Sequence, residues 1–271
     1  MSHTGFLDIT AKKKHRKTVI SSCYYEGALK ITRPVYLEDN NPSIFLIHVG
    51  GGYVDGDSYL TNLIIEKNAE LSVTTQSSTK VYKTPKQPVL QRMNIKLAQG
   101  SILEYLPDPL IAYEGARFTQ ETIVQLESGA CLFYSDIITP GWAKDGSFFR
   151  YKWIRSKLKV YKGEKLVLLD HTWLEPDGDM SGIMQMEKYT HFGTFLIIHD
   201  HVDKSFLNDL YEKLETLFPD VHFGLSALPE SGVILRILAF TTGIIDKMIH
   251  YAHSIARGKL LGKENIVWRK Y

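Results

Sequence analysis

The chain has 271 residues, of which 44 % are hydrophobic and 23 % charged, as is ordinary for a globular protein with a buried core. Its formal net charge of +2 is too small to indicate nucleic-acid binding, for which a strongly basic face is expected. The two cysteines, Cys23 and Cys131, cannot form a disulfide framework or a thiolate zinc site, and no apolar run reaches the roughly 18 residues that a membrane span needs.

The N-terminal segment has no apolar stretch followed by a small-residue cleavage site, so no signal peptide is predicted and a cytoplasmic protein is expected. The basic run at residues 12–17 is interpreted as a solvated leader before the first strand. Residues 50–57, GGGYVDGD, are glycine-rich but lack the Gly-Lys-Ser/Thr of a phosphate-binding loop. They predict a sharp turn between strands, with Asp57 near the bend.

Short strands are predicted over most of the first 200 residues. In residues 91–98, Met93, Ile95 and Leu97 alternate with polar residues, as in a strand with one buried face. Residues 116–126 and 151–161 are rich in β-branched and aromatic side chains, and turn residues separate these runs.

A weak internal repeat adds to this pattern. Four strand–turn–strand units, interpreted as hairpins, turn at Asn68, Gly100, Gly129 and Gly163. In each unit an apolar residue follows three positions after the turn, at Leu71, Leu103, Leu132 and Leu166. A spacing of roughly 30 residues favours stacked, solenoid-like units, although any antiparallel protein also repeats strand and turn.

The last quarter of the chain differs from the rest. Residues 203–217 have apolar residues at helical spacing, with Asp203 placed to cap the helix. A second helix is predicted over residues 242–257, with Gly258 at its C-terminal cap, and a strand over residues 233–240 lies between them. No linker composition separates the parts, so the sequence predicts one domain, residues 1–271, with a mostly β, stacked-hairpin body and two late α-helices.

No nucleophile motif, phosphate-binding loop or dinucleotide fingerprint is present. His199 and His201 would point to one side of a strand and, with His222 or His191, could hold Ni²⁺ or Zn²⁺. This leaves a metal-dependent β-fold enzyme as the alternative function. A surface or capping role for these histidines is favoured, because their order does not match the facial triad of oxygenases.

Four carboxylates lie on or just after the second strand of a repeat unit: Glu104, Asp108, Asp136 and Asp170. If the units stack, these positions either form a polar lane or are simply a row of turn residues.

The segments GGGYVDGD, TTQSSTKVY (residues 74–82) and LEYLPDPLI (residues 103–111), followed by a strand ending in Asp136 and then Pro140-Gly141, resemble the urease accessory protein family UreD, also called UreH. The match is best over residues 49–146. Many members carry Gly-Arg and Gly-Glu where this chain has Gly141-Trp142 and Gly146-Ser147, so charge-based roles do not carry over to those positions.

The resemblance implies a non-enzymatic chaperone of urease maturation. It implies binding to the urease apoprotein and, through UreF, to the nickel-delivering GTPase UreG, and it leaves room for a dimer within the accessory complex. It also implies a mostly β fold with two helices. No permanently bound cofactor is expected, only transient nickel, and neither nucleic acid nor membrane is an expected partner.

A transit route should bind nickel weakly enough to release it, and oxygen ligands do this better than thiolates or several histidines. We expect Asp57, Glu104 and Asp136 to form such a lane, with Asp108 nearby. Gln76, Lys80 and Tyr82 are expected to shape or pack it. Equally, TTQSSTKVY fits a structural strand whose polar side chains satisfy backbone groups. The late helices either bind UreF or cover a sheet edge.

Overall fold

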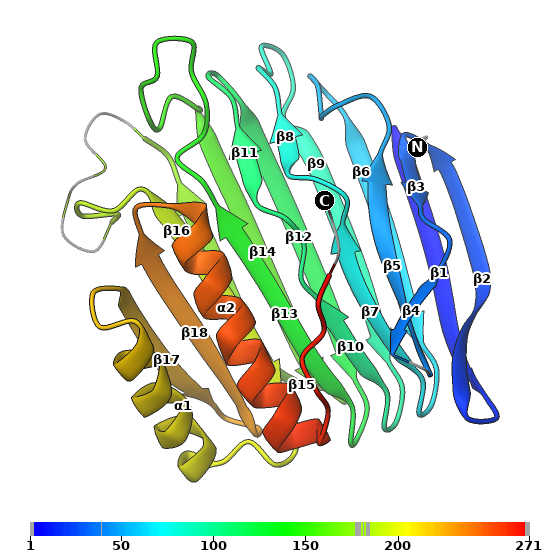
Figure 1. The fold of residues 1–271 in the computed structure, drawn as a ribbon. Coiled ribbons are helices and arrows are strands. Elements are labelled where there is room, and N and C mark those ends of the chain that lie inside the picture. The colour runs from blue at the N-terminus through cyan, green and yellow to red at the C-terminus, as the bar shows by residue number, and fades with distance from the viewer. Residues whose placement is uncertain (1–2, 39, 177–179, 181, 183–184, 269–271) are drawn as a thin grey trace.

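The computed structural model describes residues 3–38, 40–176, 180, 182 and 185–268, and the strands of this part form two sheets (Figure 1). Sheet A has seven strands in the order β15-β14-β12-β9-β6-β1-β2. Their bounds are β1 Gly5–Lys14, β2 Lys17–Gly27, β6 Ser58–Ile65, β9 Val89–Leu97, β12 Arg117–Leu126, β14 Trp153–Lys162 and β15 Lys165–Leu174.

Sheet B has eleven strands, with β17-β18-β16-β13-β10-β7-β5-β3 as its main path and β4, β8 and β11 attached beside it. Its first strands are β3 Leu29–Ile31, β4 Val35–Glu38, β5 Asn41–His48, β7 Glu70–Thr75, β8 Thr79–Val81 and β10 Ile102–Tyr105. The others are β11 Leu110–Ala112, β13 Cys131–Ile138, β16 His191–Ile198, β17 His222–Leu228 and β18 Gly232–Ala239.

The solenoid-like stacking predicted from the repeat is confirmed, but three of the four units are not hairpins. In the units that turn at Asn68, Gly100 and Gly129, the first strand lies in sheet A and the second in sheet B. Equivalent strands of successive units then pair in parallel within each sheet. Only the unit around Gly163 is a true antiparallel hairpin, β14–β15. Turn residues alone do not distinguish the two arrangements, because both require a reversal of the chain.

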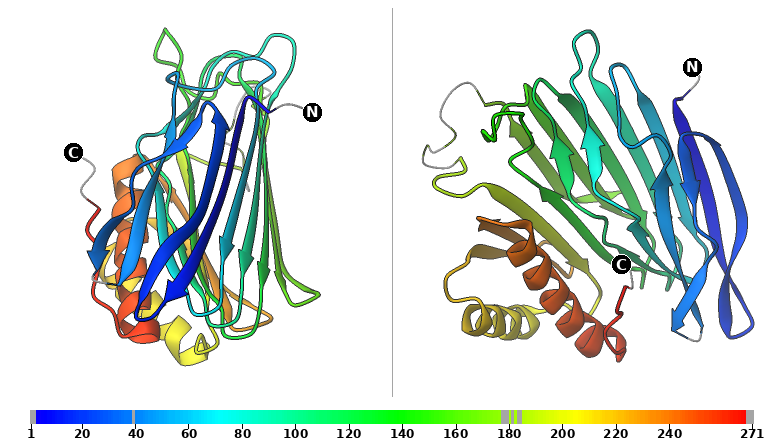
Figure 2. Two further views of the ribbon diagram at one scale, coloured as in Figure 1. Left: turned by 90° about the vertical axis from the view of Figure 1, so that its right-hand side faces the viewer. Right: turned by 45° about the horizontal axis from the view of Figure 1, so that its top comes forward.

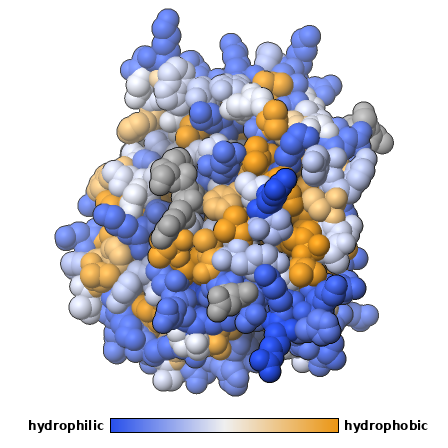
Figure 3. Space-filling model, turned by 45° about the vertical axis from the view of Figure 1, so that its right-hand side comes forward, coloured by the Kyte–Doolittle hydropathy of each residue, from blue (hydrophilic) through white to orange (hydrophobic). Residues whose placement is uncertain are grey.

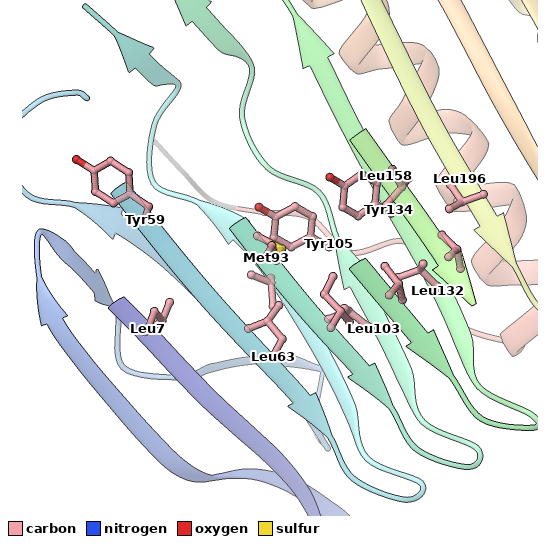
Figure 4. Packing of buried hydrophobic residues seen from close by; sticks show 14 of the residues in the cluster. Leu7, Tyr59, Leu63, Met93, Leu103, Tyr105, Leu132, Tyr134, Leu158 and Leu196 are labelled. Atoms are coloured by element: carbon pink, nitrogen blue, oxygen red, sulfur yellow. The ribbon is translucent and has the colours of Figure 1, made fainter. Parts of the chain in front are cut away.

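Three of the four repeat leucines form an in-register row in sheet B, and Figure 4 labels two of them, Leu103 and Leu132. Leu71, Leu103 and Leu132 pair across β7, β10 and β13 and are almost completely buried. Leu166 of the fourth unit is 45 % exposed, because its unit folds back within sheet A instead of crossing to sheet B. The predicted equivalence therefore holds for three leucines and is wrong for the fourth.

Opposite this row, the strands of sheet A present the alternation predicted for residues 91–98. Met93, Ile95 and Leu97 are buried, and the intervening polar residues are exposed. Ile95 pairs in register with Leu63 of β6 and with Val124 of β12. Each such side chain contributes about 1.5 to 3 kcal/mol by leaving water, so these facing rows form the main core.

The basic run at residues 12–17 is not a leader. It ends β1 and begins β2, and Lys14 pairs with Lys17 across a hairpin in which His15 has a φ of 55°. Placing the like charges at a solvent-exposed hairpin end keeps them hydrated.

The two predicted helices are present, as α1 Lys204–Leu217 and α2 Thr242–Ala256. Asp203 caps α1 by accepting a hydrogen bond from the backbone N–H of Phe206 at 2.8 Å. The predicted bounds of the second helix, residues 242–257, agree with α2 to within one residue, but the predicted cap at Gly258 is wrong. The chain continues as a π-helical turn, η1 Arg257–Leu261, and the left-handed cap residue is Gly262, with a φ of 64°.

Both helices lie on the outer side of sheet B (Figure 2), where their apolar faces form a second core with β13, β16 and β18. None of the helices in the described residues has the length and apolar character that crossing a membrane requires. On the face shown in Figure 3, apolar groups gather in the middle and hydrophilic side chains surround them.

Candidate functional site

The space between the two sheets is apolar at one end and polar at the other. Two residues beyond the leucine row, Tyr105 and Tyr134 stack with ring centroids 5.3 Å apart. In Figure 4 the hydroxyls of Tyr59, Tyr105 and Tyr134 all lie on the side away from the leucines. A cavity of about 170 Å³ occupies this end.

The mouth of the cavity is made by two loops. Gly51 and Gly52 come from the loop between β5 and β6, Gln76 from the segment between β7 and β8, and Lys80 from β8 itself. A Cβ at Gly52 would lie 2.7 Å from the Tyr82 ring and 2.9 Å from the Lys80 carbonyl oxygen. The glycine run therefore permits the close approach of these loops, in agreement with its predicted turn.

The segments TTQSSTKVY and LPDPLI are neighbours at this mouth. Thr74 Oγ1 donates to the Leu106 carbonyl at 2.6 Å, and Thr75 Oγ1 donates to Asp108 at 2.8 Å. Leu110 pairs with Thr79 where β11 meets β8. The threonines thus satisfy backbone and side-chain groups, while Gln76, Lys80 and Asp108 line the cavity. The segment TTQSSTKVY therefore contains both residues with a structural role and residues that line the cavity.

Tyr82 lies outside the cavity lining in the described structure. Its ring is 4.8 Å from that of Tyr113, which in turn is 5.0 Å from the ring of Trp142. Its hydroxyl donates to the Gly51 carbonyl at 3.4 Å. Tyr82 therefore supports the mouth from outside, and Trp142, 52 % exposed, ends the row of rings at the surface.

A polar row crosses the inner face of sheet A at one register position. Its members pair from strand to strand and line the cavities between the sheets: Tyr59, Gln91, Gln120, Ser156 and Thr172. Five strands at the usual spacing span about 19 Å. On sheet B, Asp136 of β13 pairs with Thr194 of β16 and Thr194 with Arg236 of β18. The interior thus contains two rows of oxygen- and nitrogen-bearing side chains.

Asp136 is the carboxylate at the centre of these rows. The Gln120 side-chain amide donates to it, and Ser156 Oγ donates to it at 3.4 Å. Burial raises the pKa of Asp136 to about 6, with the hydrogen bonds from Gln120 and Ser156 opposing the rise and the nearby Asp170 adding to it. Asp136 also lines a second, small cavity with Asp170 and Thr194. At neutral pH a carboxylate is therefore available between the two cavities.

Asp57 contacts the cavity through Tyr59, which is one of its lining residues. It accepts hydrogen bonds from the Val54 backbone N–H and the Tyr59 hydroxyl, both at 2.7 Å. Tyr59 Oη lies 3.0 Å from His48 Nε2. Burial and the hydrogen bond to Asp57 raise the pKa of Tyr59. Tyr59 and His48 line the cavity, so Asp57 orients part of its wall without being among the described lining residues.

Glu104 lies on the opposite face of sheet B. It is 3 % exposed, bonded to His253 Nε2 of α2 and paired with Arg257 of η1. Arg257 also pairs with Glu38 and donates from Nε to the Glu264 carbonyl at 2.7 Å. Burial favours the neutral form of Glu104, but its bonds to His253 and Arg257 outweigh this and hold its pKa below the usual range.

The expected lane is therefore not one site. Asp136, Asp108, Gln76 and Lys80 line one cavity, whereas the sheet itself separates Glu104 from them. Asp170, the last of the four strand-end carboxylates, is brought close to Asp136, because both line the small second cavity.

The histidines are not brought together as three ligands. The rings of His199 and His201 are 5.2 Å apart after the end of β16, and Asp200 between them pairs with Lys162 at 2.7 Å. His222 stacks on Tyr189 at 5.6 Å. No group of three or more His, Cys, Asp or Glu side chains suited to a metal ion occurs in the described residues.

Several cavity residues were missed from the sequence: Tyr105, Tyr134, Gln91, Gln120 and Ser156. A signal existed for the tyrosines, because each lies two positions after a repeat leucine and so shares its face. No comparable signal marked the glutamines and the serine, which became neighbours only through the strand register.

Comparison with known proteins gives one consistent result. The family model described as "UreD urease accessory protein" matches residues 3–270. A urease accessory protein UreD of Bacillus sp. (strain TB-90) is 64 % identical over 271 residues, covering all of both chains. Proteins of the same name from Lachnoclostridium phytofermentans and Staphylococcus epidermidis are 41 % and 36 % identical, and at least 98 % of each chain is covered.

Proposed function

The chain belongs to the UreD family of urease accessory proteins, and we propose that it binds the urease apoprotein and, through UreF, the nickel-delivering GTPase UreG. Membership of this family supports a role in urease maturation. In this proposal the chain acts as an assembly factor and residues 1–271 work as one unit.

We propose further that nickel passes through the interior between the two sheets. The observation that carries this proposal is the polar row of sheet A, opposite Asp136. A packed sheet interior is normally filled with apolar side chains, and burying polar ones is unfavourable unless they are paired. Here polar side chains occupy the inner face of five adjacent strands and line cavities with a mouth at Gly51 and Lys80.

The chemistry of the row suits a cation in transit. Its donors are carboxylate, amide, hydroxyl and phenol oxygens, which hold Ni²⁺ less tightly than thiolates or clustered histidines do. Asp136 supplies a negative charge midway, and the loss of water around it is compensated when a cation arrives. Glu104 has no place in this route. Its proposed role is to hold α2 and η1 against sheet B.

The outward faces of α1 and α2 remain the surface proposed for UreF, because their inward faces are already packed on sheet B. In this proposal the inward faces of the helices cover sheet B, and their outward faces bind UreF.

Co-expression tests the proposed function. The chain is produced with UreF, UreG and apo-urease, and the purified mixture is activated with nickel and bicarbonate. The proposal predicts a complex that contains this chain and a urease activity that depends on it. A chain that neither joins the complex nor raises activity above the mixture lacking it would contradict the proposal.

A further inference from the structure

The polar row does not stop at the centre of the molecule but reaches the edge of sheet A. Thr172 of the edge strand β15 lines both the small inner cavity and an outer groove of about 520 Å³. Phe192 of β16 lines the same two spaces. The inner cavity also shares Tyr134 and Asp136 with the cavity of about 170 Å³, so the three spaces are neighbours separated only by side chains that they share.

At this edge, side chains join the two sheets. β15 and β17 are the terminal strands in the orders of sheets A and B, respectively. Three ion pairs connect the β14–β15 hairpin to the end of sheet B: Asp170–Arg236 at 2.8 Å, Lys162–Asp200 at 2.7 Å and Lys165–Glu230 at 2.6 Å. We call this contact the seam. Exposed ion pairs contribute only about 0 to 1 kcal/mol each, so a single pair can be broken at little cost.

One of the three pairs differs from the others in position. Asp170 lines the inner cavity with Asp136, whereas Arg236 lines the outer groove. Arg236 also ends the in-register row Asp136–Thr194–Arg236, two strand spacings or about 10 Å from Asp136 by the usual spacing. Its side chain is 43 % exposed and that of Asp170 only 16 %. The arginine can therefore swing outward while the carboxylate stays at the inner cavity.

We propose that Arg236 is an electrostatic gate at the seam, which a divalent cation moving from Asp136 must displace from Asp170 before it reaches the outer groove. This inference rests on the proposed passage of nickel and adds a positioning residue to it. The guanidinium and the metal ion compete for one carboxylate, because two cations beside it repel each other. While Arg236 is paired, Asp170 is neutralised and the cation remains on the Asp136 side. When Arg236 moves away, Asp170 and the Thr172 and Thr194 hydroxyls offer the next set of oxygens.

A purely mechanical role for the pair makes a different prediction, and Lys165–Glu230 provides the matched control. It joins the same strand β15 to the turn between β17 and β18, and neither residue lines the described cavities. If the pairs only fasten the seam, Arg236→Gln and Lys165→Gln should have the same effect. If Arg236 is the gate, only its removal should change cation binding.

The test is calorimetric titration of the purified full-length chain with nickel chloride. Arg236→Gln is expected to tighten nickel binding about three- to fivefold, the range that a half-exposed ion pair can supply. Lys165→Gln should leave it unchanged. Asp170→Asn, which removes the contested carboxylate without disturbing the core, should weaken binding and should abolish the gain when combined with Arg236→Gln. Unchanged affinity in Arg236→Gln, or an equal gain in Lys165→Gln, overturns the gate.

Asp136→Asn separates the gate from the passage itself. If Asp136→Asn weakens nickel binding and Arg236→Gln has no effect, the passage stands and the gate is wrong. If Asp136→Asn leaves nickel binding and urease activation unchanged, the passage fails and the gate fails with it.

Discussion

The carboxylate of Asp136 is buried between the sheets, and burial disfavours its charged form. Its pKa is raised to about 6 from an ordinary value of 3.8, so the folded chain binds the proton more tightly than the unfolded chain does. Between these two pH values the folded state holds more protons, and stability falls as the pH rises. Above about pH 6 the ionised group destabilises the fold by up to about 3 kcal/mol.

Replacing this charge should therefore stabilise the protein. Asp136→Asn is expected to increase the free energy of unfolding at pH 7.5 by about 2 kcal/mol, since the amide still accepts the hydrogen bond from Gln120. The gain should shrink as the pH falls below 6 and be nearly absent at pH 4. Urea unfolding at several pH values measures this, with the exposed Asp220→Asn as control. A pH-independent gain would mean that Asp136 is not destabilised by its charge.

The positions of the carboxylates show what the sequence could reveal at this scale. Asp136 lies four residues after Leu132 and so shares its inward face, whereas Glu104 directly follows Leu103 and points outward. The alternation of side chains along a strand is therefore enough to predict that Asp136 and Glu104 lie on opposite faces of the sheet. The partners of Glu104 could not be predicted, because Arg257 is 153 residues away in the chain and reaches it only through packing of the late helix.

At the scale of elements, the repeat makes a matched pair of substitutions available. Leu132→Ala should lower the free energy of unfolding by about 3 kcal/mol, because it removes a fully buried side chain from the row that includes Leu71 and Leu103. Leu166→Ala, at the equivalent repeat position but 45 % exposed, should cost less than about 0.5 kcal/mol. Equal losses in urea unfolding would contradict the assignment of the fourth unit to a hairpin within sheet A.

The contact between α2 and sheet B depends on a buried ion network. Glu104→Ala leaves Arg257 without one carboxylate and His253 without its partner, so a loss of about 3 to 5 kcal/mol is expected. Glu121→Ala on sheet A, where the carboxylate forms a half-exposed pair with Lys159, should cost under about 1 kcal/mol.

Chemical unfolding measures both variants, and urease activation by the Glu104 variant shows how the loss acts. If a folded Glu104→Ala protein fails to support activation at a temperature well below its unfolding, Glu104 has a role beyond holding the helix.

At the scale of the whole molecule, the strands, their spacing and the two helices were predictable, because each rests on local periodicity and turn chemistry. The assignment of strands to two facing sheets was not, since a chain reversal at Gly100 or Gly129 looks the same whether the next strand pairs with the last or crosses to another sheet. The polar row is a product of that crossing. Gln91, Gln120 and Ser156 are unremarkable in three separate strands and become a row only in register.

In the proposed function, nickel reaches urease through the interior at Asp136. Activation of apo-urease at limiting nickel, by complexes containing either the unaltered chain or Asp136→Asn, tests this passage. Both are expected to form the complex equally well, and activation by the variant is expected to fall about tenfold or more, because a carboxylate beside a cation supplies at least about 1.4 kcal/mol even in a hydrated site. Normal activation by a complex carrying Asp136→Asn would mean that nickel does not pass Asp136.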